Sequence, residues 1–225
     1  MAKKGNSRHI KCLSAPLFFD IHRKEHKYVI RTRPGRHSLS RSVPLSLLLE
    51  KIGSAKSMEE AKRMLSARGV LVNGKAVKDY KYAVGLNDVI EIPSEGKRYK
   101  IEINSQGHIA PVQASKEGAN LYKVLGKYKA KGNRLMLRLH DGSVVEGKAD
   151  INVNDSITIE KGKIASHLKM GAGAHCRVID GAHVGTSGEI KELIAGGMNR
   201  PSAVTVAQKD GGTFQTPVRN IMVTK

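Results

Sequence analysis

The clearest pattern of apolar and polar positions begins at residue 42 and has the period of a helix. Ser42 is expected to cap this helix at its N-terminus, with Pro44 in the first turn. Apolar residues then recur on one helical face at Leu45, Leu48, Leu49 and Ile52. The pattern therefore predicts a short amphipathic helix that ends at Gly53.

A second helix is predicted from Ser57, because Ser57 and Glu60 have the spacing of a capping box. Gly69 is expected to end it with a left-handed residue. Asn73-Gly74 then separates two apolar runs, which is the strongest short signal for a β-hairpin. A further strand is predicted over residues 88–92. The pattern of residues 42–93 thus indicates two short helices packed on a small sheet.

The remainder of the chain alternates with the period of strands rather than helices. Tyr99, Ile101 and Ile103 alternate with polar residues, and the same period recurs at 135–139. We therefore expect an α+β, multi-domain chain that is β-rich after residue 93. The expected parts are a basic arm over 1–41, a two-helix and sheet domain over 42–93, a central β-rich domain over 94–169 and a C-terminal β-barrel domain over 170–225.

The excess of positive charge is largest in the N-terminal 41 residues. The chain has 39 Lys and Arg against 20 Asp and Glu, a formal net charge of +19, which indicates a polyanionic partner. Residues 1–41 hold 11 of the basic residues and 2 of the acidic ones, a net +9. They show little apolar periodicity, so we expect an extended arm with short ordered pieces that becomes ordered on binding.

Composition also limits the class of protein. Cys12 and Cys176 are the only cysteines and lie far apart, so no disulfide framework is expected. The N-terminus lacks the apolar run of a signal peptide, and no stretch is long enough to span a membrane. We expect a soluble, intracellular protein with no membrane partner.

The two helices and the segment Val70–Lys75 resemble the small S-four-type RNA-binding domain. In that domain the second helix and the following hairpin present basic side chains to folded RNA. The resemblance implies this role for Lys62, Arg63, Arg68 and Lys75. The alternative is that they are solvated charges on an ordinary helix face.

The segment from Gly173 to Ile190 resembles a KOW motif, with a strand, glycine-rich turns and a second strand. This resemblance implies a small SH3-like β-barrel. Asp180 departs from it, because an acidic side chain in this turn is unfavourable beside RNA. A phosphate-binding P-loop is not expected, since its Lys-Ser/Thr pair and its following helix are missing.

Taken in order, the chain is similar to the family of small-subunit ribosomal protein four of the archaeal–eukaryotic "e" type. Besides the two motifs, Arg31–Gly35, Ser42–Leu45, Val84–Val89 and Asn199–Ser202 carry this likeness. It implies a structural constituent of the cytoplasmic small ribosomal subunit that binds folded ribosomal RNA and supports translation. It also implies neighbouring ribosomal proteins as partners, and no catalysis, cofactor or small-molecule substrate. The compact length is typical of archaeal members.

The residues expected to contact RNA are basic and lie in the arm, in the S-four-type domain and in the central part of the chain. They are Lys3, Lys4, Arg8, Lys11, Arg23, Lys24, Lys27, Arg31, Arg33, Arg36, Arg41, Lys62, Arg63, Arg68, Lys75, Lys127, Lys129, Lys131 and Arg134. Lys123 belongs to the same central basic stretch, whose lysines are expected to contact phosphate. Tyr122 and Tyr128 within it could stack on bases, but the scarcity of aromatic residues favours a place in the core.

A zinc site and two other classes of RNA-associated protein have less support in the sequence. His9, Cys12, His22 and His26 have a spacing that could suit zinc, but paired cysteines are missing, so we expect no metal. A pseudouridine synthase would need an Arg-Leu-Asp triplet, and here His140 separates Leu139 from Asp141. A KOW-bearing transcription elongation factor would not be expected to carry so basic an arm.

Overall fold

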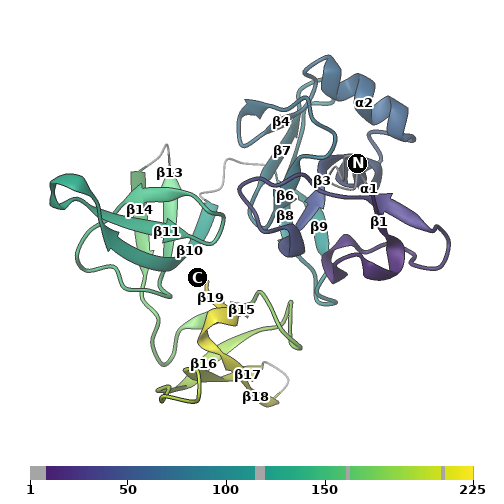
Figure 1. The fold of residues 1–225 in the computed structure, drawn as a ribbon. Coiled ribbons are helices and arrows are strands. Elements are labelled where there is room, and N and C mark those ends of the chain that lie inside the picture. The colour runs from purple at the N-terminus through teal and green to yellow at the C-terminus, as the bar shows by residue number, and fades with distance from the viewer. Residues whose placement is uncertain (1–8, 115–119, 161–162, 209–210, 225) are drawn as a thin grey trace, which may run out of the picture. The chain divides into compact units, whose positions relative to one another are not determined.

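The computed structural model describes residues 9–114, 120–160, 163–208 and 211–224 (Figure 1). The chain forms two compact units. Unit 1 comprises Met1–Glu102 and His108–Lys116, and unit 2 comprises Ile103–Gly107 and Glu117–Lys225. Both α-helices of the described residues lie in unit 1, whereas unit 2 is built from strands and short 3₁₀ turns.

The N-terminal segment is folded from residue 9 onward. Strand β1 (His9–Lys11) pairs antiparallel with β2 (Tyr28–Ile30), and the 3₁₀ turns η1 (Cys12–Ser14) and η2 (Leu17–Phe19) lie between them. Phe19 is 1% exposed and belongs to the same hydrophobic core as the helices. The predicted extended arm is therefore wrong for residues 9–41, because scattered apolar side chains bury themselves without any regular period.

Helix α1 (Leu45–Ile52) begins three residues later than its predicted cap. Ser42 lies instead in β3 (Ser42–Pro44), which pairs with β6 (Ala83–Gly85). The first two helical N–H groups, of Leu45 and Ser46, donate to backbone carbonyls of the 80–82 loop at 2.9 and 3.1 Å. Tertiary contacts thus satisfy the donors that a side-chain cap would otherwise bind.

Helix α2 (Met58–Ser66) has the predicted N-terminal cap. The Ser57 hydroxyl accepts a hydrogen bond from the Glu60 N–H at 3.2 Å. At the other end, Arg68 adopts the left-handed conformation (φ 57°), whereas the sequence predicted this role for Gly69. The N–H groups of Arg68 and Gly69 donate to the carbonyls of Leu65 and Met64, both at 3.0 Å, which is the pattern of a Schellman motif.

The predicted hairpin joins β4 (Leu71–Val72) to β5 (Lys75–Ala76), with Asn73 and Gly74 at φ 51° and 76°. Both positive φ values are those of a type I′ turn. This hairpin is one edge of a five-stranded sheet of order β5-β4-β7-β8-β9. The other strands are β7 (Val89–Ile92), β8 (Lys97–Ile103) and β9 (Ile109–Gln113).

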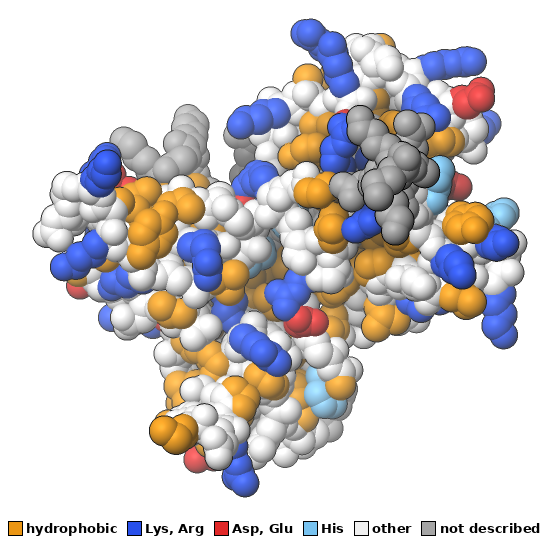
Figure 2. Space-filling model, in the orientation of Figure 1, with side chains coloured by type: hydrophobic (Ala, Val, Ile, Leu, Met, Phe, Trp, Pro, Cys, Tyr) orange, Lys and Arg blue, Asp and Glu red, His pale blue; other side chains and the backbone are white. Residues whose placement is uncertain are grey.

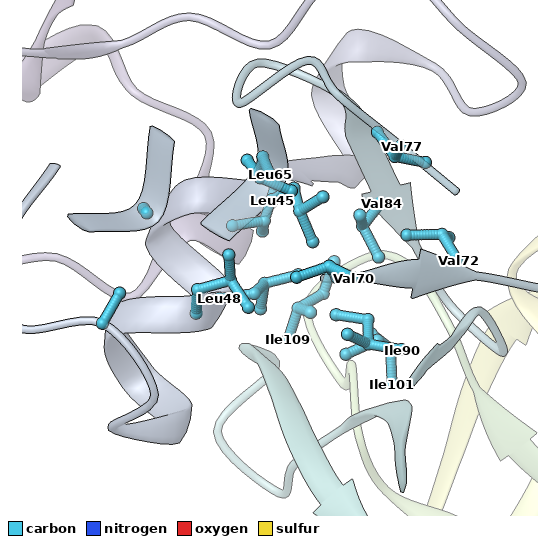
Figure 3. Close-up of a cluster of buried hydrophobic side chains, with 14 of the residues drawn as sticks. Leu45, Leu48, Leu65, Val70, Val72, Val77, Val84, Ile90, Ile101 and Ile109 are labelled. Atoms are coloured by element: carbon cyan, nitrogen blue, oxygen red, sulfur yellow. The ribbon is translucent and has the colours of Figure 1, made fainter. Parts of the chain in front are cut away.

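The same sheet continues across residue 93, where a domain boundary was expected. A tight turn at residues 93–96 pairs β7 with β8, so that Ile90 lies opposite Tyr99. The apolar side chains of β8 and β9 complete the core of unit 1, in which Leu48, Leu65, Ile90 and Ile101 are fully buried (Figure 3). Residues 97–102 and 109–113 therefore fold with the helices and not with the rest of the central segment.

Unit 2 contains two five-stranded antiparallel sheets. The first has the order β12-β11-β10-β13-β14 around a core of Val124, Leu137, Leu139, Ile151 and Ile157. Its strands are β10 (Asn120–Lys129), β11 (Leu135–Leu139), β12 (Val144–Glu146), β13 (Ser156–Glu160) and β14 (Lys163–Leu168), with the 3₁₀ turn η4 (Lys131–Asn133) between β10 and β11.

The C-terminal sheet has the order β18-β17-β16-β15-β19. Its strands are β15 (His175–Val178), β16 (Ser187–Ile194), β17 (Ala203–Gln208), β18 (Thr213–Pro217) and β19 (Ile221–Val223), and the 3₁₀ turn η5 (Val218–Asn220) precedes β19. Strands β18 and β19 end the order, so strand pairing among the described residues does not close this sheet into a barrel. The chain is thus an α+β protein, mostly β. None of its described helices is long and apolar enough to cross a membrane.

Candidate nucleic-acid interface

Helix α2 buries one face and exposes the basic one. Ala61 and Leu65 are buried in the core of unit 1, whereas Lys62 and Arg63 point to solvent. The Lys62 ammonium lies 5.0 Å from the centre of the Tyr80 ring. A cation at this distance is attracted to the ring face, so Tyr80 holds Lys62 toward the 78–82 loop.

The 78–82 loop brings three separate segments of unit 1 together. The Lys81 ammonium lies 5.4 Å from the same Tyr80 ring. Arg33 donates its backbone N–H to the Lys81 carbonyl at 2.8 Å, and its guanidinium pairs with Asp79 at 2.6 Å. The Arg33 side chain is nevertheless 68% exposed. Arg33, Lys62 and Lys81 therefore form one cationic cluster, which we call the Tyr80 cluster.

Sequence reasoning found Arg33 and Lys62 but missed Lys81 and Tyr80. The available signal was the run Lys78-Asp79-Tyr80-Lys81, which places an aromatic residue among lysines next to the predicted hairpin. Such interleaving suits nucleic-acid binding. Its contact with Arg33, 46 residues away along the chain, could not be read from spacing.

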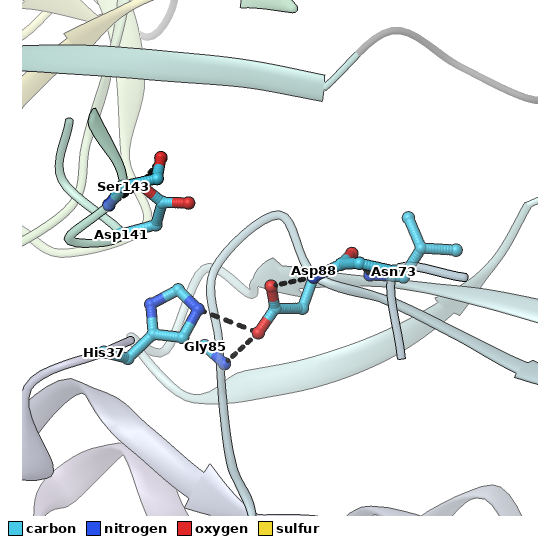
Figure 4. A network of polar contacts seen from close by, with 7 residues as sticks. His37, Asn73, Gly85, Asp88, Asp141 and Ser143 are labelled. Atoms are coloured by element: carbon cyan, nitrogen blue, oxygen red, sulfur yellow. Dashed lines mark hydrogen bonds and ion pairs between the residues drawn. The ribbon is translucent and has the colours of Figure 1, made fainter. Parts of the chain in front are cut away.

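A buried polar network fixes the Arg31–Arg36 segment against the sheet (Figure 4). The Asp88 carboxylate accepts hydrogen bonds from the His37 ring at 2.8 Å, from the Gly85 N–H at 2.9 Å and from the Asn73 side-chain amide at 2.7 Å. The His37 ring lies so close over Gly85 that any Cβ there would collide with it. The network thus links the N-terminal segment, the Asn73-Gly74 turn and strand β6, which directly follows the 78–82 loop of the Tyr80 cluster.

The remaining candidates of the N-terminal segment are spread over its surface. Lys11, Lys24 and Lys27 are exposed, and the Lys27 ammonium lies 5.6 Å from the Tyr28 ring. Arg23 donates to the carbonyls of Leu13 and Ala15, at 3.5 and 3.2 Å. Arg31, Arg36 and Arg41 also interact within the chain. Lys3, Lys4 and Arg8 lie outside the described residues.

Arg68, which follows α2, and Lys75, the first residue of β5, are both exposed. Arg68 keeps its left-handed backbone even though Gly69 follows it directly. A left-handed residue with a side chain costs about 1 kcal/mol relative to glycine. The fold therefore carries a local strain at the residue that holds this guanidinium.

The central basic stretch divides into buried and exposed parts. Lys129, Lys131 and Arg134 are exposed around η4, in the β10–β11 connection. The Lys127 ammonium donates to the carbonyls of Ala149 and Ile151 at 2.5 and 3.0 Å, so it fastens β10 to the 149–151 turn. Of these residues, Lys129, Lys131 and Arg134 are therefore the ones fully exposed to a partner.

Lys123, by contrast, is wholly buried. Its ammonium donates to the carbonyls of Val218, Arg219 and Ile221 at 2.8, 3.0 and 2.6 Å. The expectation that Lys123 contacts phosphate is therefore wrong, because all three ammonium donors are used inside unit 2. Of the two tyrosines, Tyr122 packs on the core as expected, whereas Tyr128 is 47% exposed.

Among the charged side chains on the visible face, Lys and Arg prevail: Figure 2 shows them over both units with few Asp and Glu among them. Within the described ranges, no group of three or more His, Cys, Asp and Glu side chains is placed to hold a metal ion. The Tyr80 cluster can bind phosphates through cations that are held in place. In unit 2, the exposed Tyr128 ring can stack on unpaired bases.

Models of three protein families match consecutive parts of the chain. The RS4NT (NUC023) domain matches residues 4–40, the S4 domain matches residues 43–90, and the ribosomal family S4e matches residues 95–164. The first two matches cover the N-terminal segment and the region that holds α1, α2 and the hairpin.

Curated relatives match almost the whole chain. Small ribosomal subunit protein eS4 of Sulfurisphaera tokodaii is 34% identical over 96% of this chain and 94% of the relative. The protein of the same name from Methanocaldococcus jannaschii is 33% identical over 96% and 93%, and that from Archaeoglobus fulgidus is 36% identical over 88% and 85%.

A solved structure agrees with the fold. The crystal structure of the 30S ribosomal protein S4e from Thermoplasma acidophilum is 32% identical, with a TM-score of 0.68, and the match covers 81% of this chain and 94% of that one. The fold is similar, and the sequence identity to the relatives exceeds 30% over nearly the full length of the chain. Both observations indicate common descent. The chain belongs to the eS4 family of small ribosomal subunit proteins.

Proposed function

We propose that the protein binds folded small-subunit ribosomal RNA through the Tyr80 cluster and the basic residues around it. As a member of the eS4 family it is a structural component of the cytoplasmic small ribosomal subunit and not an enzyme. The observation that carries the proposed site is that cations from three segments meet at residues 79–81. Lys62 and Lys81 lie over the Tyr80 ring, and Arg33 pairs with Asp79 beside it.

Fixed cations suit this role for a physical reason. RNA backbone contacts release counterions, so each phosphate contact adds affinity and salt dependence. A cation already held in place loses less conformational entropy when the contact forms. Arg63, Arg68 and Lys75 extend the surface along α2 and the hairpin. The other predicted contacts of the N-terminal segment, Lys3, Lys4, Arg8, Lys11, Arg23, Lys24, Lys27, Arg31, Arg36 and Arg41, remain part of the proposal.

A second contact is proposed in unit 2. Lys129, Lys131 and Arg134 are exposed together at η4, with Tyr128 beside them. Lys127 would support this site mainly by holding β10 to the 149–151 turn. The arrangement favours backbone contact with stacking as a minor contribution, since few aromatic residues are exposed.

The C-terminal sheet is proposed to be the KOW element, within a domain of residues 170–225. Its support is the β15–loop–β16 arrangement, in which Gly181 and Gly185 adopt φ 95° and 87°. At Gly188 a Cβ would collide with the Ala207 carbonyl, so the close approach of β16 to β17 requires glycine. The Asp180 carboxylate accepts the Gly181 N–H at 2.9 Å, which gives this acid a role within the turn.

The salt dependence of binding to purified small-subunit ribosomal RNA tests the main site. Lys62→Ala/Lys81→Ala should weaken binding roughly tenfold and lower the slope of log affinity against log salt by about one to two. Lys97→Ala/Lys100→Ala is the matched control, since it removes the same charge from lysines that are ion-paired with Glu95 and Glu102. Equal losses in both pairs would show a diffuse charge effect and contradict a site at Tyr80.

A further inference from the structure

A pocket of about 470 Å³ opens in the N-terminal part of unit 1, between the β1–β2 segment and helix α1. Its apolar lining includes Ile21, Tyr28, Val29, Leu47 and Met58. Among these, Tyr28 is 55% exposed. The lining therefore offers apolar surface to a partner on a chain whose formal net charge is +19.

The charges around this pocket differ from those of the surrounding sequence. Asp20, Glu25 and Glu50 line it, and they are the only three acidic residues among the first 58 of the chain. The same 58 residues contain 13 Lys and Arg, and among those from residue 9 onward only Lys51 lines the pocket. All the acidic side chains of this part of the sequence therefore line the pocket.

Two of the three carboxylates are available to a partner. Asp20 pairs with Lys51 at 2.9 Å, and this hydrogen bond lowers the pKa of Asp20. Glu25 and Glu50 are exposed and form no ion pair with any residue in the described part of the chain. Among the described residues, His22 and His26 are the other basic groups of the lining besides the paired Lys51.

We propose that this pocket binds a cationic segment of a neighbouring small-subunit ribosomal protein, with a lysine paired to Glu25 or Glu50. The stem of a lysine is apolar and its ammonium is charged, so it matches an apolar pocket with carboxylates at the rim. RNA phosphates would be repelled by the same carboxylates. The class of partner rests on membership of the eS4 family, whereas the pocket itself does not depend on the RNA site proposed at Tyr80.

Carboxyl labelling and cross-linking of purified small subunits test the occupant. A carbodiimide with glycine ethyl ester should modify Glu25 and Glu50 more slowly in the subunit than in the free full-length protein. Without added amine, the carbodiimide should join one of them to a lysine of another subunit protein. Equal labelling in both states, or protection without any cross-link to protein, would overturn the proposal. A cross-link to Lys3 or Lys4 of the same chain would also overturn it.

Charge-neutral variants separate this surface from the RNA site. Glu25→Gln/Glu50→Gln should leave affinity for purified ribosomal RNA unchanged, whereas retention in subunits during a salt wash should fall roughly fivefold. Glu59→Gln/Glu192→Gln is the control, since both side chains are exposed and neither lines the pocket. Retention equal to that of the control would contradict the proposal, even if the Tyr80 cluster binds RNA as proposed.

Discussion

The His37 ring lies 2.8 Å from the Asp88 carboxylate, and the two side chains are only 4% and 7% exposed. Their contact joins the N-terminal segment to the sheet of unit 1 across 51 residues of sequence. Asp88 also accepts hydrogen bonds from Gly85 and Asn73. One carboxylate therefore connects the N-terminal segment, strand β6 and the hairpin turn.

Asp88→Ala should therefore destabilise unit 1 by about 3 kcal/mol, because it leaves two buried donors and one partly buried donor without an acceptor. Native-state hydrogen exchange at the Gly85 amide should show the loss. Ser94→Ala, in the exposed β7–β8 turn, provides the control. Unchanged protection in the Asp88 variant would mean that apolar packing alone holds the N-terminal segment.

Lys123→Met should loosen the C-terminal sheet. The change keeps the apolar stem but removes the ammonium that donates to three carbonyls of residues 218–221, at a cost of about 3 kcal/mol. Faster hydrogen exchange is expected at the β15–β19 pairing. Lys129→Met, on an exposed position of the same strand, should change exchange very little.

Arg68 should show opposite effects on stability and on binding. Arg68→Gly is expected to stabilise unit 1 by about 1 kcal/mol, because glycine adopts the left-handed backbone without strain. The same variant should weaken binding to ribosomal RNA, whereas Arg68→Lys should retain most of both wild-type properties. A Gly variant that binds RNA as well as the wild type would remove Arg68 from the proposed interface.

Cys176 should make stability depend on alkaline pH. Burial raises the pKa of its thiol from 9.0 to about 11. The unfolded chain therefore loses this proton first, so the contribution is fully present below pH 9 and declines as pH rises toward 11. Urea melts across this window should show a steeper decline for the wild type than for Cys176→Ala. Parallel declines would assign the pH dependence to other groups.

Local sequence signals determined the elements whose stability is local. The Ser57 cap and the Asn73-Gly74 hairpin depend on residues a few positions apart, so their chemistry is visible in the sequence. The basic composition likewise indicated a polyanionic partner, and the order of the motifs indicated the family by resemblance. Helix α2 was predicted with its correct exposed basic face.

Tertiary structure decided whatever depends on contacts between distant residues. Ser42 became a strand residue because Gly85 pairs with it, and the N-terminal segment folds because Phe19 reaches the core of the helices. Lys123 and Lys129 look alike in the sequence, yet one is buried under three carbonyls and the other is exposed. Residue type fixes the charge of a side chain, but only the packing of distant segments decides whether that charge meets solvent or the protein's own backbone.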